Sequence, residues 1–174
     1  IAAAAAERGA TVTLISGPTA LRHHAAVTRI DVVSAEDMSE QVNRQLPSCD
    51  ILVMAAAVAD WRPLEIKKQK WKKTTADQSI PLTRTPDILK ELSIGDRSGR
   101  LVIGFAAETD NVMAHGRAKL EAKKLDAIVV NDVSKTNTGF EADTNAGTIL
   151  LKDGTKVRLP LSDKREMADN IWDT

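Results

Sequence analysis

An unbroken apolar stretch in the middle of the chain limits the possible folds more than any other segment. Residues 50–58 read DILVMAAAV, with no polar position after Asp50. Runs of this kind are typical of a strand in a parallel sheet that helices cover on both faces. We therefore expect a buried central strand at 50–58. Asp60 follows it closely, at the edge where open α/β sheets bind ligands.

Strand-like and helix-like segments alternate around this stretch. Short β-branched runs predict further strands at 10–16, 27–33, 100–107 and 126–131. Capping and composition signals predict helices at 1–9, 34–46, from 85 onward, at 111–124 and at 163–172. This alternation predicts an α/β fold: a Rossmann-like, mostly parallel sheet with helices on both faces.

Two other segments have their own character. Asp153-Gly154 is a hairpin turn signal between residues 147–151 and 155–159, so we expect a small antiparallel β-hairpin near the end of the chain. Residues 136–146 are rich in turn formers. Residues 59–79 are polar and basic, and we expect them to form a flexible flap.

Composition limits the classes of function. The 174 residues suit a single domain, 1–174, and the formal net charge of zero gives no general support for binding nucleic acid or a membrane surface. No apolar run approaches the roughly 20 residues of a membrane span. The single cysteine, Cys49, excludes an internal disulfide and fits a reducing, cytoplasmic location.

The chain opens on a helix that begins in its middle. Ile1–Arg8 has the composition of the second half of a helix, and Gly9 suits its C-cap. In a doubly wound fold the preceding sequence would supply the first strand and its Gly-rich turn. We therefore expect a domain that lacks its N-terminal strand and Gly-rich loop.

Two neighbouring features suggest phosphate chemistry. Asp60 lies at the predicted ligand edge, although a carboxylate there also serves as a turn or cap residue. Ammonium groups on long stems suit a triphosphate and a leaving pyrophosphate, although a charge run is usually only a solvated face. Trp71 within the run favours a flap that packs over a ligand. The lysines of this run are Lys67, Lys68, Lys70, Lys72 and Lys73.

Further candidates lie along the second half of the chain. Thr85-Pro86-Asp87 is a strong helix start, with Thr85 as the expected cap and Pro86 at the first helical position. Lys119 and Lys123 share a helix face. Phe105 is either a core residue or a base-stacking platform. Asn131-Asp132, after the last parallel strand, repeats the argument made for Asp60 and marks a possible substrate side. The histidines show no convincing metal spacing, so the metal ligands stay unknown.

Seven segments in order resemble one family. They are AAAAAERGATVTLISGPT, AAVADWRP, KWKK, TPDIL, VIGFAAET, KLEAKKLDAIVVNDVS and GFEADTNA. Together they resemble phosphopantothenate–cysteine ligase, also called phosphopantothenoylcysteine synthetase, over almost the whole chain. Trp61 and Trp71 stand where the family usually has Tyr and Ile.

The resemblance implies a reaction and a set of residues. Such enzymes use CTP, with Mg²⁺, to activate 4′-phosphopantothenate as an acyl-cytidylate, which the amine of L-cysteine attacks to give the amide and CMP. The resemblance makes Lys70 the catalytic flap lysine. It implies CTP contacts at Met54, Ala55, Ala56, Asp60, Lys70, Pro86, Asp87, Ile88, Leu89, Phe105, Lys119 and Lys123.

The resemblance also implies partners and one departure. The family is typically dimeric, and we expect residues 147–159 to form part of the contact. In many bacteria the synthetase is fused to a flavin-dependent decarboxylase, so FMN is expected only if that domain exists outside this chain. The family's Gly-rich NHSSG-like segment, whose Asn acts on the acyl intermediate, does not precede Ile1 in this sequence.

Two other classes of function remain open from the residues alone. A nicotinamide-dependent oxidoreductase on a Rossmann sheet would need a Gly-rich turn, and the sequence has no GxGxxG motif. A non-catalytic interaction domain would show no selective nucleotide binding. Fold alone does not separate these classes from a ligase.

Overall fold

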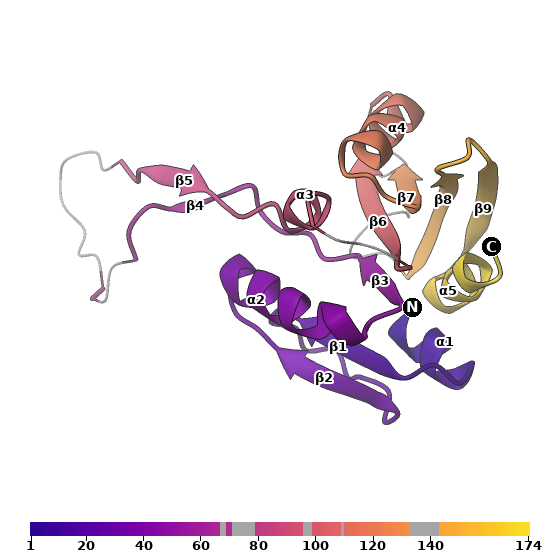
Figure 1. The fold of residues 1–174 in the computed structure, drawn as a ribbon, viewed down its shortest axis with the longest axis horizontal. Helices are drawn as coiled ribbons and strands as arrows, with labels where there is room; N and C mark the ends of the chain where they lie inside the picture. The colour runs from indigo at the N-terminus through magenta and orange to yellow at the C-terminus, as the bar shows by residue number, and fades with distance from the viewer. Residues whose placement is uncertain (67–68, 71–78, 96–98, 109, 133–142) are drawn as a thin grey trace.

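The computed structural model describes residues 1–66, 69–70, 79–95, 99–108, 110–132 and 143–174. Its largest sheet has five strands (Figure 1). They are, in spatial order, β3 (Ile51–Met54), β6 (Leu101–Glu108), β7 (Ala127–Asp132), β8 (Thr144–Leu151) and β9 (Lys156–Asp163). The strands β3, β6 and β7 are parallel, and β8 and β9 continue the sheet in antiparallel pairing. The predicted α/β class is confirmed.

The predicted hairpin is confirmed but is longer than expected. Strand β8 begins at Thr144, within the segment that composition predicted as turns, and pairs with both β7 and β9. The turn after β8 contains Gly154 at φ +97°, a left-handed conformation that glycine adopts without strain. Of the predicted turn segment, residues 136–142 lie outside the described residues.

The prediction of a buried central strand at 50–58 is wrong in two respects. Strand β3 covers only Ile51–Met54, and it is an edge of the five-stranded sheet, where Ile51 is 44% exposed. The central strand is β7, in which Val129 is fully buried. The apolar run has another cause: Leu52, Met54 and Val58 pack against a cluster formed by neighbouring helices. Ile51 and the alanines 55–57 are exposed, and the other residues of 51–58 are only half-buried, so the apolar run does not by itself establish a buried strand.

Helices cover both faces of this sheet, as expected. Along β7, alternate side chains point to opposite faces. Ile128 and Val130 pack on the side of α4 (Val112–Ala122), whereas Val129 packs on the side of α5 (Lys164–Trp172). Figure 1 shows α4 and α5 on opposite sides of the strands, with α1 (Ala2–Glu7) beside α5.

Sequence signals also define the N-terminal layer. The C-cap of α1 is Arg8, and Gly9, the predicted C-cap, is the next residue, with a left-handed φ of +90°. Strands β1 (Val12–Ser16) and β2 (Val27–Asp31) form a separate parallel pair. Helix α2 (Ala35–Gln45) starts with the predicted capping box, and the short 3-10 helix η1 (Leu46–Ser48) follows it at Pro47. Met38 and Val42 of α2 pack against α3 (Ile88–Leu92).

A two-stranded arm leaves the body between β3 and α3. Strand β4 (Trp61–Pro63) pairs antiparallel with β5 (Leu82–Arg84), and Figure 1 shows this arm projecting away from the other elements. The sequence predicted only a flexible flap at 59–79. The pairing of β4 with β5 at the base of this segment corrects that prediction. Residues 67–68 and 71–78 lie outside the described part. Within that part, no helix is long and apolar enough to cross a membrane.

Candidate active site

The carboxyl ends of β3, β6 and β7 meet at one edge of the sheet, because the three strands are parallel. Several predicted residues lie where the chain leaves this edge. Met54 ends β3 and packs in the cluster between α2 and α3, while Ala55, Ala56 and Asp60 are exposed in the loop that leads to the arm.

Three contacts hold the base of the arm. The backbone N–H of Thr85 donates to the carbonyl oxygen of Asp60 at 2.9 Å, which closes the two strands beside the sheet edge. The guanidinium of Arg84 lies 5.2 Å from the ring centre of Trp61, a cation–π contact. Arg62 forms an ion pair with Glu36 of α2. The first two contacts join the two strands of the arm, and the third joins the arm to α2.

The start of α3 differs from the predicted one. The N-cap is Asp87, whose carboxylate accepts from the backbone N–H of Lys90 at 3.2 Å, and not Thr85. Pro86 precedes the helix and does not occupy its first position. The cause is that a residue before proline prefers an extended conformation, so Thr85 continues the arm and the helix starts later. Ile88 is buried, and Leu89 packs on the α4 side of the sheet.

Two ion pairs join α4 to this edge. Lys123 Nζ lies 3.0 Å from Asp87 Oδ1, and Lys119 Nζ lies 2.6 Å from Glu108 Oε1. Three of these residues were predicted as nucleotide contacts: Lys123 and Asp87 pair with each other, whereas Lys119 pairs with Glu108. The fourth, Glu108, was missed. It ends β6, so the argument applied to Asp60, a carboxylate at the carboxyl end of a strand, would have found it.

The contacts of Asp87 shift its pKa below the usual range for an aspartate. Partial burial acts in the opposite direction, but the hydrogen bonds from the Lys123 ammonium and the backbone N–H of Lys90 outweigh it. The lowered pKa favours the ionised carboxylate of Asp87, which pairs with the Lys123 ammonium.

The structure does not bring all the predicted residues together. Phe105 packs in the core on the α5 side of the sheet, whereas Lys119 and Lys123 lie on the helix that covers the other face. Lys70 is exposed in the arm, which leads away from α4 (Figure 1). Of the predicted basic run, Lys67, Lys68, Lys72 and Lys73 lie outside the described residues, as does Trp71.

Asn131 has an unusual environment at the end of β7. Its side-chain oxygen Oδ1 is buried and has no hydrogen-bond partner within the described structure. A Cβ atom on Gly147 of the neighbouring strand would lie 2.8 Å from this oxygen and 2.6 Å from the carbonyl oxygen of Val130. Glycine at this position therefore leaves room for the amide. Asp132 is the last residue of the same strand.

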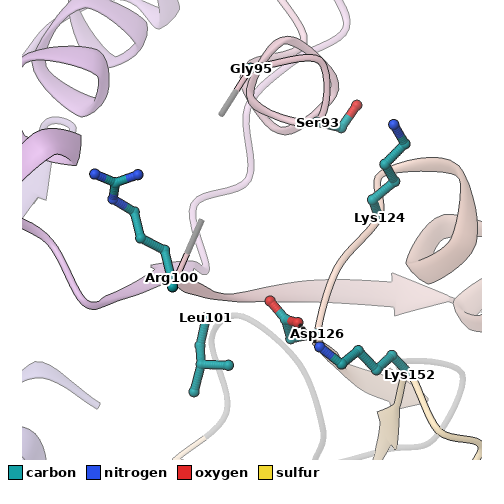
Figure 2. Close-up of a pocket in the computed structure, with 8 residues that line it drawn as sticks. Ser93, Gly95, Arg100, Leu101, Lys124, Asp126 and Lys152 are labelled. Atoms are coloured by element: carbon teal, nitrogen blue, oxygen red, sulfur yellow. Dashed lines mark hydrogen bonds and ion pairs between the residues drawn. The ribbon is translucent and has the colours of Figure 1, made fainter. Parts of the chain in front are cut away.

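A hollow of about 540 Å³ lies at the opposite end of the sheet, near the amino ends of β6 and β7 (Figure 2). There the carboxylate of Asp126 accepts from the backbone N–H of Val102 at 2.9 Å and from Lys152 Nζ at 2.6 Å. These bonds tie the β8–β9 turn to the sheet. The hollow is lined by Ser93, Gly95, Gly99, Arg100, Leu101, Lys124, Asp126 and Lys152. None of these residues belongs to the predicted site.

Comparison with known proteins identifies the family. Residues 1–174 match the family described as "DNA/pantothenate metabolism flavoprotein C-terminal domain". The chain is 43% identical over 172 residues to the Coenzyme A biosynthesis bifunctional protein CoaBC of Bacillus subtilis, covering 98% of this chain and 42% of that protein. It is 42% identical over 176 residues to the protein of the same name from Escherichia coli K12, covering 99% of this chain and 43% of that one.

A solved structure agrees with these relatives. The crystal structure of the C-terminal domain of a Coenzyme A biosynthesis bifunctional protein CoaBC superposes with a TM-score of 0.82 at 39% identity, covering 99% of this chain and 76% of that one. The chain spans less than half the length of the full-length relatives. The chain belongs to the DNA/pantothenate metabolism flavoprotein C-terminal domain family.

Proposed function

We propose that this chain carries the phosphopantothenate–cysteine ligase activity of coenzyme A biosynthesis. The proposal is supported by the family of the chain, whose relatives are named for coenzyme A biosynthesis. The observation that carries it is the presence of two lysine–carboxylate pairs, Lys119 with Glu108 and Lys123 with Asp87, which include three of the predicted nucleotide contacts.

The proposed reaction has two steps. The carboxylate of 4′-phosphopantothenate attacks the α-phosphorus of CTP, an acyl-cytidylate forms and pyrophosphate leaves. The amine of L-cysteine then attacks the acyl carbon, the amide forms and CMP leaves. Both steps develop negative charge on phosphate oxygens, which positioned ammonium groups stabilise. We assign this role to Lys119 and Lys123 on α4 and to Lys70 on the arm, the proposed catalytic residue.

The remaining predicted contacts receive roles by position. Met54, Ala55, Ala56 and Asp60 would border the nucleotide where β3 ends. Backbone groups from Pro86 to Leu89 would read the hydrogen-bonding edge of cytosine, because a buried polar edge separates bases better than stacking does. The buried, unpartnered oxygen of Asn131 would accept a hydrogen bond from the substrate side of the site, next to Asp132.

Metal and partners complete the proposal. Mg²⁺ would arrive with the phosphates of CTP and keep part of its water shell, as it does in many nucleotide sites. Within the described residues, no group of three or more His, Cys, Asp or Glu side chains could hold a metal ion. A fused FMN-dependent decarboxylase domain would lie outside this chain. We also propose a cytoplasmic homodimer, with β8–β9 as part of the contact, since β9 is an edge of the sheet and Leu161 on it is exposed.

The test follows product formation on this chain and on the full-length natural protein. Each is mixed with Mg²⁺, CTP, 4′-phosphopantothenate and cysteine, and CMP, pyrophosphate and amide are measured, with ATP in place of CTP as a control. We expect CTP-selective CMP release coupled to amide formation. No CTP binding and no product with either protein would contradict the proposal and favour a non-catalytic interaction domain.

A matched pair of variants tests the proposed catalytic residue. Lys70→Gln should reduce turnover by about 100-fold or more, the scale of losing a group that stabilises transition-state charge, while the thermal stability stays the same because Lys70 is exposed. Arg44→Gln, which removes an exposed cation from the last turn of α2, should leave turnover unchanged. Near-normal turnover of Lys70→Gln would remove Lys70 from the mechanism.

A further inference from the structure

Glu108 is a mostly buried carboxylate at the predicted ligand edge that the proposed function does not yet use. It is the last residue of β6, and only 14% of its side chain is exposed. Its two oxygens have different partners: Oε1 lies 2.6 Å from Lys119 Nζ, and Oε2 lies 3.4 Å from His115 Nδ1. His115 and Lys119 are four residues apart, so one face of α4 points to this carboxylate.

We propose that Glu108 is a positioning residue for Lys119, holding its ammonium group where the phosphates of the nucleotide bind. The inference rests on the proposed function, because it gives Lys119 the nucleotide contact described above. A lysine has a long, flexible stem, and a free one would lose its motion when the ligand arrives. Glu108 fixes that stem beforehand, so less conformational freedom is lost on binding.

The geometry allows Lys119 to serve both partners. An ammonium group has three N–H donors, and one of them suffices for Glu108 Oε1. The remaining donors can bond to phosphate oxygens. About half of the Lys119 side chain is exposed, whereas its carboxylate partner is mostly buried. The carboxylate of Glu108 is therefore held within the protein, while the Lys119 side chain extends towards solvent. A ligand that arrives from solvent can then reach the ammonium group.

Lys123 and Asp87 form a second lysine–carboxylate pair of the same kind. Lys123 on α4 bonds to Asp87, which also caps α3, so its carboxylate partner is fixed by a second contact. Glu108 is held by its place at the end of β6, where it pairs with Asp132 of β7. Each lysine thus has a carboxylate anchored in a different element. The Arg117–Glu121 pair lies on the same helix, and both of its side chains are largely exposed, at 44% and 64%.

This exposed pair provides the matched control. Glu108→Gln keeps the size of the side chain and removes its charge, and Glu121→Gln makes the same change on the exposed pair. The dissociation constant of CTP with Mg²⁺ is measured by titration calorimetry on the full-length protein. We expect Glu108→Gln to weaken CTP binding about fivefold, within the range of pairwise couplings between contacting residues. Glu121→Gln should bind as the wild type does.

Three further measurements distinguish a positioning role of Glu108 from a purely structural one. In a Lys119→Met background, Glu108→Gln should cause no additional loss of CTP affinity, because its effect acts through Lys119. The kcat should fall as well, because Lys119 is also assigned to the charge that develops in the transition state, and this fall should be absent in the Lys119→Met background. Glu108→Asp, which keeps the charge on a shorter stem, should restore part of the affinity.

The possible failures are distinct. Wild-type affinity in Glu108→Gln, or equal losses with and without Lys119, would overturn the positioning role and leave the proposed function intact. If Glu108→Gln unfolds at a lower temperature, the comparison with Glu108→Asp at a temperature where both are folded still decides the question. If the wild type itself binds no CTP, the proposed function and this inference are both refuted.

Discussion

Gly116 gives the sharpest test of how α4 is packed on the sheet. It lies in the middle of α4, and it is buried against Val130 of β7. A Cβ atom at this position would lie 2.5 Å from Cγ2 of Val130 and 3.3 Å from Cδ1 of Leu150. The first distance is far inside van der Waals contact. We therefore predict that Gly116→Ala destabilises the protein, although alanine is the better helix former.

Two opposing effects determine the size of the change. Replacing glycine by alanine within a helix stabilises it by about 1 kcal/mol. Forcing a methyl group into a packed core costs about 1–3 kcal/mol. We expect the upper end of that range, because Val130 is β-branched, 1% exposed and fixed on the central strand, so its side chain has little freedom to yield. The net effect is then a loss of about 2 kcal/mol.

Urea denaturation measures this loss directly. The midpoint should fall with an unchanged slope, and the melting temperature should fall by about 4–8 °C for a chain of this length. Ala118→Gly, on the exposed side of the same helix, measures the helix-propensity effect alone and should cost about 1 kcal/mol. A Gly116→Ala protein as stable as the wild type would show that α4 shifts without cost, and the packing argument would be wrong.

Two further predictions concern capping and pH. Ser34→Ala removes the hydroxyl that accepts from the backbone N–H of Asp37, and it should cost about 1 kcal/mol in thermal or urea unfolding. An unchanged stability would show that the capping box of α2 contributes nothing. Lys123→Met should raise the pKa of Asp87, followed by NMR titration, because the ammonium hydrogen bond is lost. A carboxyl with a lowered pKa stabilises the fold above its unfolded pKa of about 3.9, and that stability is lost as the pH falls through the folded pKa. Lys123→Met should therefore lose less stability than the wild type between about pH 5 and pH 2; an equal loss would contradict the assignment.

Local signals predicted the helices and strands well where their cause is local. The capping box at Ser34, the left-handed glycine after α1 and the Asp-Gly turn between β8 and β9 each depend on residues close together in the chain. The start of α3 was misplaced by two residues. There Pro86 favours an extended conformation for Thr85, the residue before it. The N–H of Thr85 also bonds to Asp60 at the base of the arm, so the helix begins after Asp87.

The CTP contacts at Asp87, Lys119 and Lys123, which the family resemblance implied, stay a prediction. The structure pairs Lys123 with Asp87 and Lys119 with Glu108. Phe105 was left open between a core residue and a stacking platform, and the structure places it in the core on the α5 side. Glu108 was missed, although its place at the end of a strand was visible in the sequence.

What the sequence determined by itself was therefore the type of most helices and strands outside the arm, the α/β class and the family-specific motifs, because hydrophobic periodicity, caps and turns act over a few residues. Tertiary structure decided which strand is central, how the arm leaves the body and which carboxylate meets which lysine. The edge position of β3 depends on pairing with β6, about 50 residues away in the chain. The Lys119–Glu108 pair depends on how α4 lies across the end of β6. Such contacts follow from packing between distant segments, and no local pattern encodes them.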